Sequence, residues 1–585
     1  MSDVQPIRLH QPRTRLKGRQ ASPQAQAEVA ALLGDQPPRR DWLIEYLHRI
    51  QDAHRGLSTD HLAALAQWMK CSQAEVFEVA TFYHHFDVLR EGEAAADLTI
   101  RVCDGLSCAL AGAEALLAEV ERLTQAPGVR VVRAPCVGRC EQAPVAVVHQ
   151  VPVAAATPDR VLAQVRSGDK VQALPPGLGR FDPVQQVQAA VVSAEHTLDT
   201  LPDAVGHAAY VQAGGYQLLA QVHAAQVTRE QVIQCLSDSG LRGLGGAGFP
   251  AGRKWDIVSK QAAPRLMAVN IDEGEPGTFK DRTYLERDPH RFLEGMLVAA
   301  QVVGISAIYI YLRDEYHACR ALLQRELAAL QANAPVPLPH IELRRGAGAY
   351  ICGEESAMIE SIEGKRGEPR MRPPYIAEVG LFGRPTLAHN FETLYWVRDI
   401  VQRGPAWFSG YGRHGRKGLR SFSVSGRVRQ PGVKLVDAGI TVRELIDEHC
   451  GGMLHGHQFY AYLPGGASGG ILPATLGDVP LDFDTLQAHG CFIGSAAVVI
   501  LSDQDRARDA ALNTMRFFEH ESCGQCTPCR VGTAKAAALM ASPQWDQPTL
   551  SDLAQVMGDA SICGLGQAAP NPIRCVQQHF MHEVS

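Results

Sequence analysis

Apolar positions recur at helical spacing along the first part of the chain. In WLIEYLHRIQDAHRG, Leu43 and Ile50 fall on one helical face, and polar residues occupy the other. Ser72 followed by Glu75 has the spacing of a capping box, so we expect another helix to begin there. These patterns predict a helical N-terminal domain over residues 1–95.

A strand pattern replaces the helical one near residue 96. DLTIRVCDG and VRVVRAPCVGRC each predict a strand that ends at cysteines, APVAVVHQ predicts a third strand, and AGAEALLAEVERLT predicts a helix. We therefore expect a small α/β domain at 96–170. Proline, glycine and polar residues then predict an interdomain linker at 171–204.

The rest of the chain divides by pattern into three parts. We expect a large α/β domain at 205–420, a small α+β unit at 421–490, and mainly helices at 491–585. The predicted fold class is therefore a multidomain α/β and α+β protein. Apolar runs are too short for a membrane-spanning helix, which needs about 20 residues.

Composition and charge narrow the class of protein. The 585 residues are 46% apolar and 20% charged, which is typical of a soluble globular protein. The net charge of −6 gives no basic signature for nucleic acid, so we expect no such partner. The first residues lack the apolar segment of a secretory signal, so we expect a cytoplasmic protein, in which disulfides are rare. The 15 cysteines therefore call for another explanation.

Three cysteines near the C-terminus have the C-x-x-C-x-x-C spacing. In ESCGQCTPCRVG, this spacing lets Cys523, Cys526 and Cys529 reach neighbouring corners of a [4Fe–4S] cube. Zinc is the competing metal, although zinc ribbons favour two C-x-x-C pairs. As the fourth ligand we expect Cys563, in the glycine-rich loop SICGLGQ, rather than Cys575, which we expect to pack in a helix.

Four further cysteines follow predicted strands of the 96–170 domain. Cys103 and Cys108 lie in VCDGLSC, and Cys136 and Cys140 lie in APCVGRC. Two loops with two thiolates each, at the same end of a small sheet, predict a [2Fe–2S] site. A pair of redox thiols or a zinc site is the alternative.

Two glycine-rich segments and two acidic loops predict a nucleotide site at 205–420. SGLRGLGGAGFPAGRKW offers backbone amides for a phosphate, together with the cation of Lys254. VNIDEGEPGTFKDR carries three carboxylates after a predicted strand, and GAGAYICGEESA carries two more. The Walker A pattern and the full dinucleotide fingerprint are both absent from these segments, so an ordinary Rossmann domain is not predicted.

The motifs together resemble a known family. GLRGLGGAGFPAGRKW, NIDEGEPGTFKDR, GAGAYICGEESA and ESCGQCTPCRVGT resemble, in order, the NADH-binding flavoprotein subunit of respiratory complex I and its soluble relatives, over about 205–580. EVATFYHHF, CDGLSC and APCVGRCEQAP resemble the companion subunit, a helical segment with a thioredoxin-like [2Fe–2S] domain. The chain is thus identified as a fusion of the two electron-input subunits. The resemblance also implies a β-grasp domain at 421–490 and a helical cluster-binding bundle at the end.

The resemblance further implies FMN and NAD(H) as cofactors, beside one [4Fe–4S] and one [2Fe–2S] cluster. The residues implied to hold or line FMN are Gly243, Gly245, Gly246, Lys254, Asn270, Asp272, Gly353 and Asn390. Phe249 and Tyr375 are implied to sandwich adenine, and Glu275 and Glu355 are implied as catalytic residues at the nicotinamide ribose. The other residues implied at the nucleotide site are Glu273, Glu354, Arg372 and His389. The positions that depart from the residues common in the family are Leu244, Arg372, Tyr375 and His389.

These parts predict one activity. NADH gives two electrons as a hydride, iron–sulfur clusters carry one electron at a time, and a flavin handles both. We therefore expect an NAD-dependent oxidoreductase (a diaphorase) that exchanges hydride between NAD(H) and FMN, and single electrons with clusters and partner subunits.

The partner is inferred from resemblance alone. GLRGLGGAGFPAGRK, VCDGLSCALAGAE and APCVGRCEQAPVAV look most like NAD-dependent molybdenum formate dehydrogenases, which implies a hetero-oligomer with a molybdenum and iron–sulfur catalytic subunit. An NAD-reducing hydrogenase and complex I are the alternatives. From other classes, a non-catalytic iron–sulfur electron-transfer module and a small-ligand-binding scaffold also stay open.

Overall fold

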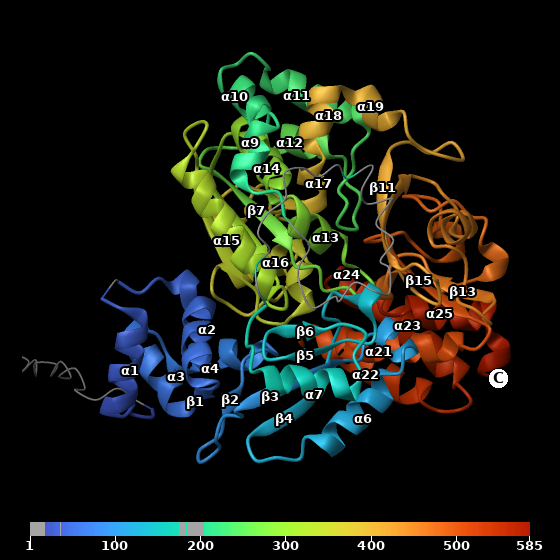
Figure 1. The fold of residues 1–585 in the computed structure, drawn as a ribbon, viewed down its shortest axis with the longest axis horizontal. Coiled ribbons are helices and arrows are strands. Elements are labelled where there is room, and N and C mark those ends of the chain that lie inside the picture. Colours follow the sequence, from blue (N-terminus) through green and yellow to red (C-terminus); the bar gives the residue numbers. More distant parts are fainter. Residues whose placement is uncertain (1–17, 36, 173, 175–182, 184–203) are drawn as a thin grey trace, which may run out of the picture. The chain divides into compact units, whose positions relative to one another are not determined.

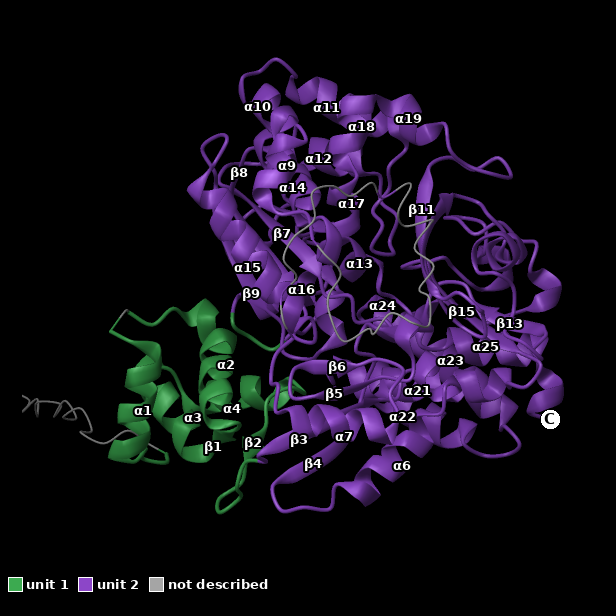
Figure 2. Cartoon of the chain, viewed as in Figure 1, with its two compact units in different colours: residues 1–95, 364–366 green, residues 96–363, 367–585 purple. Residues whose placement is uncertain are grey.

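The computed structural model describes residues 18–35, 37–172, 174, 183 and 204–585 (Figure 1). Two compact units result, residues 1–95 with 364–366, and residues 96–363 with 367–585 (Figure 2). The start of the chain, where we expect no secretory signal, and most of the linker expected at 171–204 lie outside the described residues. None of the helices in the described ranges has the length and hydropathy that a membrane crossing requires.

The first unit is helical, as its apolar periodicity predicts. Glu75 N donates to Ser72 Oγ at 3.1 Å and Ser72 N donates to the Glu75 carboxylate at 3.1 Å, which confirms the capping box. Leu43 and Ile50 are fully buried, so the face that they share forms core. The elements are α1 (Pro23–Leu33), α2 (Leu43–His54), β1 (Leu57–Ser58), α3 (Thr59–Met69), α4 (Gln73–Phe82) and β2 (Val88–Leu89).

The second unit begins with a four-stranded sheet of order β4-β3-β5-β6, in which β3 and β4 run parallel. Its buried face includes Ile100 and Val102, which pack with Leu116 and Val120 of a covering helix. The third strand expected in APVAVVHQ is shorter than its pattern, because His149 adopts a left-handed conformation and turns the chain into a further strand. The elements are β3 (Leu98–Cys103), α5 (Leu106–Leu110), α6 (Ala113–Leu123), β4 (Val129–Ala134), β5 (Ala146–Val148), β6 (Val151–Val153) and α7 (Pro158–Ser167).

A parallel sheet of order β10-β7-β8-β9 forms the centre of the next domain (Figure 1). Its core joins Met267 and Ile308 of the sheet to Phe292 and Met296 of a helix. The strands are β7 (Arg265–Ile271), β8 (Ile305–Leu312), β9 (His340–Arg345) and β10 (Thr386–Asn390). The helices are α9 (His207–Gln212), α10 (Gln217–His223), α11 (Arg229–Ser239), α12 (Ala251–Ser259), α13 (Lys280–Arg287), α14 (Pro289–Val303), α15 (His317–Ala332), α16 (Glu355–Ile362), α17 (Phe391–Tyr395), α18 (Val397–Arg403) and α19 (Pro405–Ser409).

A second sheet has the order β12-β11-β15-β13-β14. We expected its domain to end at residue 490, but β15 pairs with both β11 and β13 and so extends the sheet past that boundary. All six residues of β15 are buried, as is usual for a central strand. The elements are β11 (Leu419–Gly426), β12 (Gly432–Asp437), α20 (Val442–Glu444), β13 (Phe459–Leu463), β14 (Leu472–Pro473) and β15 (Ala497–Ser502).

The chain ends in helices, which agrees with the expected bundle. Cys563 was expected in a glycine-rich loop, but it caps the start of a short helix that contains both neighbouring glycines, Gly564 and Gly566. The helices are α21 (Ala507–Glu521), α22 (Thr527–Met540), α23 (Gln547–Ala560), α24 (Gly564–Ala568) and α25 (Asn571–His579). The multidomain α/β and α+β class predicted from the sequence is thereby confirmed.

Candidate functional site

The carboxyl ends of β7 and β10 bring several predicted residues together. The two strands are parallel neighbours, and Asn390 lies opposite Asn270. Asn270 Nδ2 donates to Gly353 O at 2.8 Å, and Asp272 N donates back to Asn270 Oδ1 at 2.9 Å. The two acidic loops therefore meet at the sheet edge where ligands bind in open α/β folds.

The glycine loop crosses the end of β10. Gly243 N donates to Phe249 O at 2.8 Å and closes the loop. Gly245 lies so close to Asn390 that an added Cβ would be 2.9 Å from the Asn390 Cβ. Gly246 has φ +127°, which side chains rarely adopt, so the loop needs glycine at both positions.

Lys254 points from α12 toward the same strand end. Its Nζ donates to Ala388 O at 3.1 Å, and burial lowers its pKa while the Glu355 charge opposes that shift. Asp272 Oδ2 is buried and has no hydrogen-bond partner among the described residues. A cation, open backbone amides and a vacant acceptor fit a ligand that carries a phosphate and hydroxyl groups, as FMN does.

We expect Gly245→Ala to weaken flavin binding. Relieving the clash with Asn390 costs about 1–3 kcal/mol, or about 5–150-fold in affinity. Flavin content and fluorescence titration of the refilled protein measure this change. Gly206→Ala is the control, because its Cβ would meet only Glu326 Oε2, at 3.9 Å. Equal flavin affinity in the two variants would contradict the expectation.

Glu275 is fixed by residues from two domains. Ser468 N donates to Glu275 Oε1 at 2.8 Å, the Ser468 hydroxyl donates to the same oxygen, and Tyr350 OH donates to Oε2 at 3.3 Å. Burial raises the pKa of Glu275. Sequence analysis missed Ser468 and Tyr350; the glycine-rich stretch PGGASGG, which contains Ser468, was the available signal.

Glu354 and Glu355 begin α16 beside a basic residue. Glu354 Oε2 accepts from Ser356 N at 3.0 Å and caps the helix. Arg372 pairs with Glu354 and, at 3.3 Å, with Glu355. The Glu354 carboxylate is thus engaged within the protein, whereas Glu355 is partly exposed.

The aromatic residues differ in their surroundings. Phe249 and Tyr375 are 37% and 56% exposed, so both rings are open to stacking. His389 is buried, and Trp255 Nε1 donates to its Nε2 at 2.7 Å. Burial and the nearby Lys254 charge hold the pKa of His389 well below its usual range, so the imidazole is neutral.

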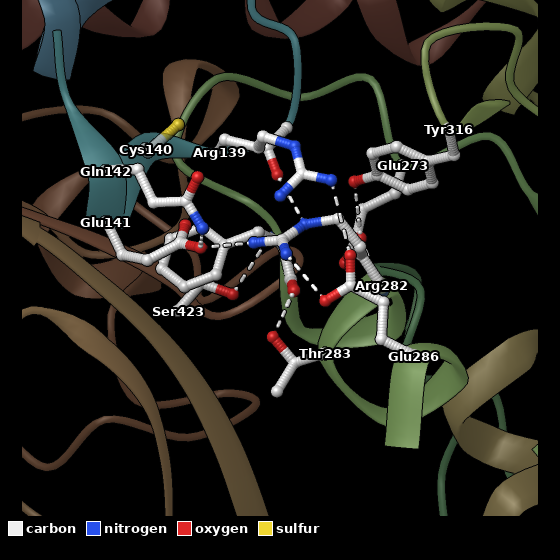
Figure 3. Close-up of polar contacts among 12 residues, drawn as sticks. Arg139, Cys140, Glu141, Gln142, Glu273, Arg282, Thr283, Glu286, Tyr316 and Ser423 are labelled. Atoms are coloured by element: carbon white, nitrogen blue, oxygen red, sulfur yellow. Dashed lines mark hydrogen bonds and ion pairs between the residues drawn. The ribbon is translucent and has the colours of Figure 1, made fainter. Parts of the chain in front are cut away.

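Glu273 points away from this edge, into a buried polar network (Figure 3). Its carboxylate accepts from Asp281 N at 2.8 Å, Arg282 N at 3.1 Å and Tyr316 OH at 2.9 Å. These bonds fix the start of α13. The position implied for Glu273 at the nucleotide is therefore occupied by a side chain with three partners inside the protein.

The same network reaches the Cys136–Cys140 loop (Figure 3). Arg282 Nε donates to Gly138 O at 2.9 Å, and its guanidinium pairs with Glu141 and Glu286. Arg313 Nη2 donates to Cys136 O at 2.6 Å, and its other nitrogen donates to Glu273 O. Sequence analysis missed both arginines, which tie the predicted [2Fe–2S] loop to the acidic loop.

We expect stability to fall as the pH rises from about 4.5 to about 7, partly through Glu273. Burial, then the Asp281 charge, raises its pKa from 4.5 to about 7. Within this window the folded protein keeps a proton that the unfolded chain releases, so folding weakens with rising pH and levels off above it. Glu273→Gln should show a smaller fall in urea midpoint across the window. The exposed Glu519→Gln should keep the wild-type slope; an unchanged slope in Glu273→Gln would refute this assignment.

Four thiols converge at the end of β3 and β4. Cys136 Sγ and Cys140 Sγ are 3.3 Å apart, and hydrogen bonds from Cys108 and Cys136 raise the pKa of Cys103. All four are buried. Four converging thiols fit the ligand set of a [2Fe–2S] cluster.

The C-terminal thiols form a second group. Burial raises the pKa of Cys529 to about 11, with further contributions from Cys526 and Cys523. Burial also raises the pKa of Cys563 to about 12, and Cys523 contributes to that shift. Cys575 instead lies with its Sγ 3.5 Å from Cys491 Sγ. The structure therefore brings Cys563 to the C-x-x-C-x-x-C motif, as the proposed fourth ligand must be.

Family comparisons match most of the chain. The families described as Nuo51 FMN-binding domain, thioredoxin-like [2Fe-2S] ferredoxin, NADH-ubiquinone oxidoreductase-F iron-sulfur binding region and SLBB domain match residues 236–399, 29–167, 509–585 and 421–472. The domains therefore include FMN-, [2Fe–2S]- and [4Fe–4S]-binding types, and these cofactor predictions are confirmed.

Known proteins are similar over long stretches. An F-type NADH-quinone oxidoreductase protein of Rhizobium meliloti is 40% identical over 399 residues, which cover 66% of this chain and 94% of that protein. The 51 kDa subunit of NADH-ubiquinone oxidoreductase of Neurospora crassa is 41% identical over 60% of this chain and 76% of its own. The crystal structure of an NAD+-reducing [NiFe]-hydrogenase in the H2-reduced state matches 94% of this chain and 93% of that chain, with 32% identity and a TM-score of 0.78.

Proposed function

Because this chain belongs to the F-type family of NADH-quinone oxidoreductase proteins, the FMN and iron–sulfur flavoproteins, we propose that it is the NAD-side subunit of an NAD-dependent formate dehydrogenase. The chain itself is an NADH dehydrogenase flavoprotein subunit with an added thioredoxin-like [2Fe–2S] domain. Resemblance of VCDGLSCALAGAE and APCVGRCEQAPVAV to formate dehydrogenase subunits supports formate as the electron donor.

One observation carries the NAD-side assignment. The glycine loop, both acidic loops and two exposed aromatic rings belong to one domain, and the same compact unit holds two sets of four cysteines. When bound, FMN supplies the exchange between hydride and single-electron chemistry that links NAD(H) to such clusters.

The protein's own residues supply binding and orientation. The glycine-loop amides and Lys254 are placed to hold phosphate, and the vacant Asp272 Oδ2 is placed to accept from a hydroxyl. Phe249 and Tyr375 would stack on adenine, since both rings are exposed. Glu275 would orient the nicotinamide ribose, because Ser468 and Tyr350 fix its carboxylate. Such positioning removes much of the entropic barrier to a reaction between two bound groups.

The second candidate is an NAD-reducing hydrogenase. The solved structure that matches 94% of this chain comes from such an enzyme, and the match includes nearly the full length of its chain. That likeness concerns the NAD-side subunit, and the two candidates differ in the partner. The choice between them therefore rests on the partner's metal.

The deciding experiment isolates the complex anaerobically through a tag on this chain. NAD⁺ reduction is assayed with formate and separately with hydrogen, and molybdenum and nickel are measured in the same sample. Formate activity with molybdenum is the expected result. Hydrogen activity with nickel would establish the second candidate and reject formate.

NADH oxidation with an artificial dye is the companion assay for the chain itself. We expect bound flavin and dye reduction whichever partner is present. Flavin and dye reduction without either donor activity would reject both partner assignments. Absent flavin would instead favour a non-catalytic electron-transfer module, and bound flavin without NADH oxidation would favour a ligand-binding scaffold.

A further inference from the structure

Two cysteines outside both proposed cluster sites lie against one another. Cys491, in the loop before β15, has its Sγ 3.5 Å from the Sγ of Cys575 on α25, 84 residues later. Each is 1% exposed. Cys491 directly follows the exposed Gly490, so the pair lies just beneath the surface.

We propose that Cys491 and Cys575 form a redox-modification site, a dithiol that a peroxide oxidises to a disulfide. A disulfide bond is about 2.05 Å long, so the sulfurs need to approach by about 1.5 Å. One residue lies in a loop and the other on a helix of nine residues, Asn571–His579. A rotation of one side chain and a small loop movement supply that approach.

The chemistry balances with peroxide as the two-electron oxidant. The Cys575 sulfur attacks one peroxide oxygen, the O–O bond breaks, and one water leaves as Cys575 becomes a sulfenic acid. The Cys491 sulfur then attacks the Cys575 sulfur and releases the second water. Two thiols and one hydrogen peroxide thus give one disulfide and two waters.

The pair is asymmetric in a way that suits this order. The hydrogen bond from Cys491 is the main cause of a lowered pKa at Cys575, to which the Arg574 charge also contributes. The same contact with Cys575, together with burial, raises the pKa of Cys491. Since the thiolate is the nucleophile, Cys575 is the sulfur that reacts first.

A glycine connects the two sulfurs to the loop that holds Glu275. A Cβ on Gly470 would lie 2.5 Å from Cys491 Sγ and 3.0 Å from Cys575 Sγ, so its backbone rests on both atoms. Ser468, two residues earlier, donates to Glu275. Asn571, one turn before Cys575, donates through Nδ2 to Ser468 O at 2.9 Å.

Disulfide formation should therefore disturb the contact between Ser468 and Glu275. This consequence rests on the proposed role of Glu275 in NAD(H) binding, whereas disulfide formation itself does not. We expect the KM for NADH to rise about fivefold, at the low end of ordinary coupling between sites.

The test treats the anaerobically isolated holoenzyme with stoichiometric hydrogen peroxide and then blocks free thiols with N-ethylmaleimide. Peptide mass mapping is expected to find Cys491 linked to Cys575, with recovery of both thiols after dithiothreitol. Iron and flavin contents are followed in the same samples, so that cluster loss is recognised. Full reactivity of both thiols toward the reagent after denaturation, at peroxide levels that oxidise other cysteines, would overturn the proposal.

Variants separate the disulfide from its consequence. Cys491→Ser and Cys575→Ser should each lack the linked peptide and keep an unchanged KM for NADH after peroxide treatment. Cys450→Ser is the matched control, since Cys450 is a buried cysteine whose pKa burial raises to about 12, and it should behave as wild type. A linked peptide without a KM change would uphold the modification site and reject its coupling to Glu275. A peroxide-induced KM change that persists in Cys491→Ser would likewise reject that coupling.

Discussion

Lys280→Met is expected to lower the free energy of unfolding by about 3–5 kcal/mol, the usual cost of removing one partner of a buried ion pair. Lys280 is 2% exposed, and its Nζ lies 2.7 Å from Asp281 Oδ1 and 3.0 Å from Glu392 Oε2. Burial opposes its charge, but the two carboxylates outweigh burial and raise its pKa. Without the ammonium, two buried carboxylates lose their counter-charge.

Urea denaturation followed by tryptophan fluorescence and circular dichroism measures this loss. Lys260→Met is the matched control, because Lys260 pairs with Asp256 at 2.6 Å while its side chain is 70% exposed. Exposed pairs of this kind contribute little, so the control should unfold close to wild type. A Lys280→Met midpoint equal to that of the control would show that the buried pair is not stabilising.

Arg282→Met is expected to loosen the Cys136–Cys140 loop. The change leaves Glu141 and Glu286 without their guanidinium and removes the donor to Gly138 O. A loss of about 3–5 kcal/mol in local opening energy corresponds to roughly 10²–10³-fold faster amide exchange in that loop.

Hydrogen exchange read by mass spectrometry measures this effect, with the EPR spectrum of the [2Fe–2S] cluster as a second readout. Arg122→Met serves as the control, since Arg122 pairs with Glu119 on an exposed helix face of the same domain. We expect normal exchange and an unchanged spectrum in the control. If the Cys136–Cys140 loop of Arg282→Met stays as protected as wild type, Arg282 does not hold it.

Local patterns predicted much of the fold and the residues of the site. The strands before Cys103 and Cys136 and the capping box at Ser72 depend on residues close in sequence, so periodicity and spacing reveal them. The end of the second sheet was placed too early, because β15 returns to pair with strands formed long before it.

Contacts between distant segments carried the information that the sequence lacked. Ser468 lies 193 residues from Glu275, and Arg313 lies 177 residues from Cys136. Each meets its partner only after separate domains have docked, and a single sequence holds no periodicity for such a meeting. The polar network around Glu273 was hidden for the same reason, although the motif NIDEGEPGTFKDR contains both Glu273 and Arg282.

The arginine network between the Cys136–Cys140 loop and the acidic loop joins two parts of one polypeptide. Tethered partners meet at an effective concentration in the millimolar range for a short flexible connection. Contacts too weak to hold separate proteins together can therefore keep the two domains docked, and dilution cannot dissociate them. One translated chain also fixes their ratio at one to one, so neither cofactor domain is made in excess of the other.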